Sequence, residues 1–233
     1  VREQFRLEMK ELTDTLVLQA QAAAKAINGA AASLKDANLA LAERVIDADH
    51  NIDLLERNID EMGISLLARQ APVASDLRTV VSALRLSATL ERMGDLARHV
   101  AYVARGRSPK TVGSGDVQDL FENMADKAAQ VGELVAKLVE TQDLSIADAI
   151  IAGDDELDDM HAKTFEYALD DGLDLTRQEI VDVILLGRYL ERECGGTFPG
   201  AVFGGGRHAV DAEAQGIDTV YGASGGVDGE ALN

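Results

Sequence analysis

The chain has 233 residues, of which 46% are hydrophobic, so it can bury a substantial core. Its 41 acidic residues against 22 Lys and Arg give a formal net charge of -19 at pH 7, which argues against nucleic acid and anionic membranes as partners. A single cysteine, Cys194, rules out an intrachain disulfide framework. The charged N-terminal stretch predicts no signal peptide, and no apolar run predicts membrane insertion. We therefore expect a cytoplasmic protein.

The first half of the chain shows apolar residues at helical spacing and few helix-breaking residues. This pattern predicts three amphipathic helices, separated by SLKDAN at residues 33–38 and by RQAPVASD at residues 69–76. The second break contains Pro72, which has no amide proton to donate. RGRSPKTVGSGD at residues 105–116 is typical of a linker.

The second half repeats the pattern of the first. Three further helices are predicted in VQDLFENMADKAAQVGELVAKLV, SIADAIIAGDDELDDMHAKTFEYALDD and TRQEIVDVILLGRYLERE. A shift of 105 residues aligns Asp49 with Asp154, and a shift of 100 residues aligns Glu91 with Glu191. The predicted fold is all-α, a tandem repeat of two three-helix bundles: residues 1–106, a linker at residues 107–116, and residues 117–193.

The composition changes abruptly near residue 194. Glycine accounts for 11 of the last 40 residues but only 10 of the first 193. Glycine-rich chain loses much entropy on ordering, so we expect residues 194–233 to be a disordered tail and the sixth helix to be truncated. A break at a single residue is typical of a shifted reading frame.

Carboxylates lie next to the predicted core at helical spacing. In the third helix, Glu91 and Asp95 continue an apolar edge. The second helix carries a column of four acids, and the fifth helix carries a similar one: Asp49, Asp53, Glu56 and Asp60, then Asp154 and Asp158 followed by His161. Carboxylates four residues apart point the same way and repel each other, so a positive charge must offset them.

Two interpretations of these columns remain open. They are solvated faces balanced in part by Arg57, Arg92 and Arg98, or their oxygens converge on cations. His161 follows Asp158 by three residues and is a further candidate ligand, whereas His50 and His99 are predicted at the surface or at an edge. No Ser-His-Asp or Cys-His pattern predicts nucleophilic catalysis.

Two stretches resemble the PhoU family of phosphate uptake regulators, particularly its actinobacterial members. They are LARQAPVASDLRTVVSALRLSATLERMGDLARHVA and, about ninety residues later, LLGRYLER. The specific motifs are P-V-A-x-D-L-R at Pro72 to Arg78, L-E-R-x-G-D at Leu90 to Asp95, and a partial repeat at Leu190 to Arg192. The resemblance extends from residue 1 to about residue 192.

The resemblance implies a non-enzymatic adaptor. Such proteins, often homodimers, hold a phosphate-responsive sensor histidine kinase inactive together with the ATPase of a phosphate-specific ABC transporter, and they restrain uptake. Some bind multinuclear iron or zinc through E(D)-x-x-x-D motifs on the bundle surface. The matching positions here are Asp49, Asp53, Glu91, Asp95, Asp154, Asp158 and Glu191.

The chain departs from the family where an aspartate should follow Glu191 by four residues, because it has Gly195. We therefore expect an impaired second metal site and a less stable second bundle. The alternatives are a ferritin-like metal-carboxylate enzyme or storage protein, for which only Asp158 with His161 approximates the required motif, and a metal-free coiled-coil scaffold.

Overall fold

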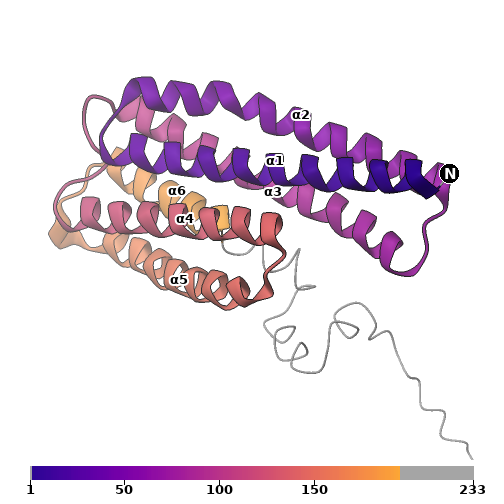
Figure 1. The fold of residues 1–233 in the computed structure, drawn as a ribbon. Coiled ribbons are helices and arrows are strands. Elements are labelled where there is room, and N and C mark those ends of the chain that lie inside the picture. Colours follow the sequence, from indigo (N-terminus) through magenta and orange to yellow (C-terminus); the bar gives the residue numbers. More distant parts are fainter. Residues whose placement is uncertain (1, 195–233) are drawn as a thin grey trace, which may run out of the picture.

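The computed structural model describes residues 2–194, and these form helices and turns without a strand. The first three helices are α1 (Arg2–Lys35), α2 (Leu39–Gln70) and α3 (Ala74–Arg107). The next three are shorter: α4 (Asp116–Thr141), α5 (Ala147–Leu169) and α6 (Arg177–Cys194). Figure 1 shows α1, α2 and α3 side by side, with α4, α5 and α6 forming a second layer against them. The all-α prediction is confirmed, whereas residues 195–233 lie outside the described part.

The helix boundaries have local chemical causes. The side chain of Asn38 accepts a hydrogen bond of 3.0 Å from the amide of Leu41 and so caps α2. At α6, the amide of Thr176 donates to the carboxylate of Glu179, and the amide of Glu179 donates back to the hydroxyl of Thr176. This reciprocal pair is a capping box, which satisfies two amides that a helix end leaves unpaired.

One continuous core joins the two halves, with α1 at its centre. This helix packs against α2 and α3 and also contacts α4. A Cβ atom at Gly132 of α4 would lie 3.1 Å from Cδ1 of Ile27, so glycine permits close contact between α1 and α4. The halves therefore share a hydrophobic interior. Within the first half, the buried side chain of Gln19 in α1 also donates a hydrogen bond to the carbonyl of Ser87 in α3.

The apolar edge of α3 that leads to Glu91 and Asp95 lies at the rim of the core. Leu77 is 40% exposed, and Ala88 is also exposed. The fully buried line of the helix is a neighbouring one, formed by Val80, Ala83, Ser87, Leu90, Gly94 and Ala97. The two acids therefore lie at the boundary between core and solvent.

An ion pair ties the second half to the end of α3. The guanidinium of Arg107 donates to both carboxylate oxygens of Asp182 in α6, over 2.5 and 2.8 Å. Asp182 is 4% exposed and also accepts a hydrogen bond from Gln178. Removing one member of a buried pair leaves the other charge uncompensated.

Replacing Arg107 with methionine should therefore lower the free energy of unfolding by about 2 to 4 kcal/mol, as measured by urea denaturation. The matched control is Arg105→Met, because Arg105 is exposed on the same helix and lies over the ring of Tyr102, at 5.0 Å, in a cation–π arrangement. That change should cost less than about 1 kcal/mol. Equal losses in the two variants would contradict a stabilising role for the buried pair.

Candidate functional site

Five carboxylates form an acidic face where α2 lies against α3. Asp49, Asp53 and Glu56 come from α2, and Glu91 and Asp95 come from α3. Spacings of three or four residues place each set on one side of its helix. The charges of all five act on one another, because the other four acids each raise the pKa of Glu91. The fold therefore brings together the four acids that were predicted in the first half, Asp49, Asp53, Glu91 and Asp95, and adds Glu56 to them.

Asp49 is the most buried of these acids, with 3% of its surface exposed. The guanidinium of Arg98 donates through Nη1 to Oδ2 of Asp49, and its Nη2 lies 2.6 Å from Oδ1 of Asp95. Gly94 permits this arrangement, since a Cβ atom there would lie 2.7 Å from Cδ1 of Ile52 on α2. Burial raises the pKa of Asp49, and the charge of Arg98 opposes that shift. Arg98 thus bridges the acids of the two helices.

Glu91 lies half-buried on the same face. Burial raises its pKa to about 7, with further contributions from Asp95, Glu56, Asp53 and Asp49 in that order. The ordinary pKa of a glutamate is 4.5, so Glu91 changes its charge near neutral pH. A bound cation or a basic partner would favour the ionised form of Glu91.

The second half carries a smaller acidic face on α5 and α6. Asp154 and Asp158 lie half-buried on α5, one turn apart, and Nδ1 of His161 lies 3.9 Å from Oε2 of Glu191 on α6. Burial raises the pKa of Glu191, whereas His161 lowers it. The Nε2 atom of His161 is buried and has no hydrogen-bond partner among the described residues.

The sequence predicts the acids better than their partners. Arg98 is visible in the sequence only as one of three balancing arginines, although its position three residues after Asp95 is a signal for the ion pair with that residue. His50 is exposed as predicted, and His99 lies at an edge, where it stacks on Tyr189 of α6 with 5.1 Å between ring centroids. Gly195 and the expected tail lie outside the described residues.

Within the described part of the chain, no three His, Cys, Asp or Glu side chains form a group that could hold a metal ion as they stand. In the first half, Asp49 and Asp95 are occupied by Arg98. The metal assignments to Asp49, Asp53, Glu91, Asp95, Asp154, Asp158 and Glu191 therefore stay predictions. Among residues 2–194, no helix combines the length and the apolar character needed to cross a membrane.

A family model described as "PhoU domain" matches residues 16–104 and 121–193. The chain is 36% identical over 192 residues to the phosphate-specific transport system accessory protein PhoU homolog 2 of Mycobacterium tuberculosis, covering 82% of this chain and 90% of that protein. It is 35% identical over 192 residues to homolog 1 of Mycobacterium leprae, covering 82% of this chain and 86% of the relative.

Two crystal structures have the same fold. PhoU from Pseudomonas aeruginosa superposes with a TM-score of 0.70 at 27% identity, over 81% of this chain and 91% of that one. The phosphate transport system regulatory protein PhoU from Streptococcus pneumoniae gives a TM-score of 0.67 at 21% identity, over 86% of this chain and 97% of that one, and shows the fold alone.

The raised pKa of Glu91 has a consequence for stability. A group with a higher pKa in the folded state stabilises the fold below its unfolded pKa of 4.5, and this contribution is lost as pH rises through about 7. Glu91→Gln should therefore raise the free energy of unfolding, relative to the parent, by about 1 to 2 kcal/mol at pH 8 and by little at pH 5, after allowance for the solvent exposure of the group.

Urea denaturation of both proteins across this pH range, with a chelator present, measures the difference. Asp148→Asn is the control, because Asp148 is exposed on α5. A difference between Glu91→Gln and the parent that does not change with pH would contradict the raised pKa.

Proposed function

Because the chain belongs to the PhoU family, we propose that it regulates phosphate homeostasis as a cytoplasmic adaptor and not as an enzyme. One observation carries the proposal, namely the 36% identity over 192 residues to a protein named as an accessory of a phosphate-specific transport system. The two partners are the ATPase of the phosphate ABC transporter and a sensor histidine kinase. When phosphate is plentiful, the protein restrains both phosphate uptake and starvation signalling.

The acidic face on α2 and α3 supports docking of basic partners. Asp53 and Glu91 are half-buried there, and Arg98 is already engaged by Asp49 and Asp95. A partner that supplies Lys or Arg side chains would offset the remaining charge and favour the ionised form of Glu91. We further propose that the protein functions as a homodimer, as the resemblance implies.

We also propose that the acidic faces bind iron or zinc. The donor atoms are of the types that such a cation takes, with carboxylates that raise the pKa of Glu91 on the first face and Nδ1 of His161 at 3.9 Å from Glu191 on the second. Binding on the first face would require Arg98 to release Asp49 and Asp95. Asp49, Asp53, Glu91 and Asp95 would hold the first ion, and Asp154, Asp158 and Glu191 the second. A bound ion would neutralise the face and hold its carboxylates in place. The ferritin-like alternative has no observation in its favour beyond Asp158 with His161.

Deletion of the gene should derepress phosphate-starvation genes in phosphate-rich medium, and a plasmid copy should restore repression. The purified protein should also retain the transporter ATPase and the sensor kinase in a pull-down. Normal repression in the deletion strain would contradict the proposed function.

Charge reversal tests the docking face directly. Asp53→Lys with Glu56→Lys should reduce partner retention in the pull-down by about tenfold or more, because both acids belong to the acidic face. The control is Asp148→Lys with Glu166→Lys, which makes the same charge change at exposed positions of α5. Equal retention by the two double variants would exclude the acidic face as the docking surface.

Asp95→Asn should weaken metal binding by about tenfold or more while helicity stays unchanged. The physical reason is the loss of one carboxylate ligand from the first face. The effect is measured by elemental analysis and by a metal titration in which the release of protons is monitored. Asp148→Asn serves as the control. An unchanged metal content would exclude Asp95 as a ligand.

A further inference from the structure

A groove runs along the surface between α1 and α2, on the side of α2 next to the acidic face. The groove is open to solvent, and its volume is about 810 Å³. The floor is apolar and built mainly from small side chains: Ala22, Ala26, Gly29 and Ala32 of α1, with Leu41, Val45, Ala48 and Ile52 of α2. The rim is polar, with Lys25 and Asn28 on α1 and Arg44, Asp47 and Asn51 on α2.

The groove exists because α1 has small residues where it meets α2. A Cβ atom at Gly29 would lie 2.6 Å from Cγ2 of Val45, so glycine allows the two helices to approach closely there. The alanines on either side have methyl side chains, which cannot fill the space above this contact. Another helix could therefore approach the floor closely and place larger side chains into it.

The rim differs in charge from the rest of the protein. Lys25 and Arg44 are exposed, and neither forms an ion pair among the described residues. Among the described residues, Asp47 is the one acid that lines the groove. Along this stretch a protein with a net charge of -19 thus presents two cations against one anion. An acidic segment is attracted to this rim, although most of the surface repels it.

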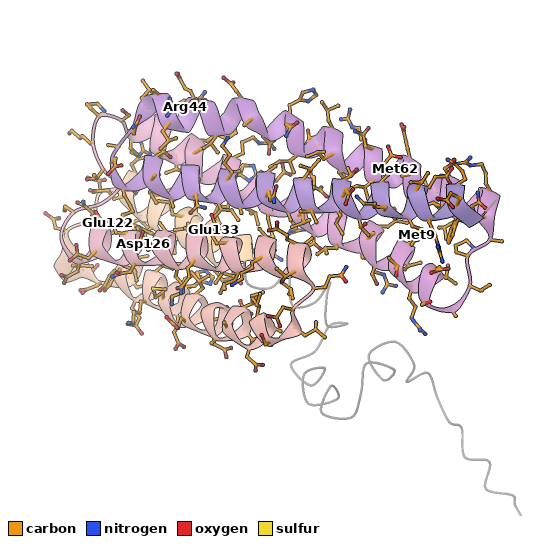
Figure 2. The ribbon with its side chains drawn as sticks, viewed as in Figure 1. Met9, Arg44, Met62, Glu122, Asp126 and Glu133 are labelled. Carbon is orange, nitrogen blue, oxygen red and sulfur yellow. The ribbon has the colours of Figure 1, made fainter. Side chains whose placement is uncertain are left out.

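Acids on the far side of α1 are already engaged. Figure 2 shows Arg44 on α2, with Asp126 and Glu133 on α4 and α1 between them. Asp126 pairs with Lys35 over 2.6 Å, and Glu133 accepts a hydrogen bond from Asn28. Glu133 thus bonds a rim residue of the groove, and with Glu140 it also lines a second pocket next to Lys25. Neither acid forms an ion pair with Lys25 or Arg44, so both cations of the groove remain unpaired among the described residues.

We propose that the groove between α1 and α2 binds an amphipathic helix of a partner protein, with large apolar side chains on the floor and Asp or Glu opposite Lys25 and Arg44. From Leu41 to Ile52 the floor is about 16 Å long, which matches about three helical turns. A bound helix presents apolar residues at i, i+3, i+4 and i+7. The inference rests on the proposed function only in that the protein acts by binding other proteins.

A peptide selection against the full chain tests this proposal. The library consists of helical peptides of about 15 residues with Leu, Ile, Met or Phe at i, i+3, i+4 and i+7, and with Asp, Glu, Lys or Gln varied at the flanking positions. Selected peptides should be enriched in acids at the flanks. The absence of enrichment, or enrichment in Lys, would overturn the proposal.

Variants of the protein then locate the binding site. Lys25→Glu with Arg44→Glu should weaken binding of the selected peptide about tenfold or more, and a Lys-flanked version of that peptide should recover affinity for this variant. Ala48→Phe should also weaken binding, because Ala48 is exposed and the larger side chain fills the groove without altering the core. The control, Arg6→Glu with Lys163→Glu, makes the same charge change at exposed positions and should keep affinity within about twofold.

Undiminished binding to either groove variant would overturn the proposal, as would equal loss in the control. Sedimentation identifies a competing occupant: a dimer of the parent that dissociates in Ala48→Phe would assign the groove to a second copy of the chain. The peptide assay is independent of phosphate signalling, so its failure is distinguishable from failure of the proposed function. A deletion strain with derepressed starvation genes and a groove that binds no peptide would reject only this inference.

Discussion

The guanidinium of Arg98 holds together the two helices that carry the acidic face. It joins the nearly buried carboxylate of Asp49 on α2 to that of Asp95 on α3, at the level where Gly94 lets the helices meet. Without this cation, a buried carboxylate would lose its partner, at a high cost in free energy. On the same face, burial first and the neighbouring acids second raise the pKa of Glu91 to about 7.

In the second half, a histidine occupies the position of one of these carboxylates. His161 lies at the position that the 105-residue shift aligns with Glu56, so an imidazole replaces one carboxylate of the repeated face. Its Nδ1 lies 3.9 Å from Glu191, and the neighbouring charge lowers the pKa of that acid where burial raises it. The second face therefore has three carboxylates beside an imidazole, whereas the first has five carboxylates beside the guanidinium of Arg98.

The helices and the acidic faces could be predicted because both depend on local spacing. Apolar residues at helical intervals predicted six helices, and carboxylates three or four residues apart predicted the columns. The sharing of Arg98 depends on how closely α2 approaches α3. Gly94 permits this close approach, which cannot be predicted from the spacing of residues along the sequence. Likewise, Ala22, Gly29 and Ala48 look like ordinary helix residues, and the groove they line follows only from the packing of α1 on α2.

Helix α2 contributes residues to two surfaces that differ in charge. Its groove side carries Arg44 and Ala48, and the adjacent side carries Asp53 and Glu56. Ile52 lies at the boundary, since it lines the groove and also meets Gly94 on α3. A displacement of α2 along or about its axis would change both surfaces together, because the same rigid helix carries both sets of side chains. The acidic face and the groove therefore share one helix, and the side chain of Ile52 belongs to the packing beneath both surfaces.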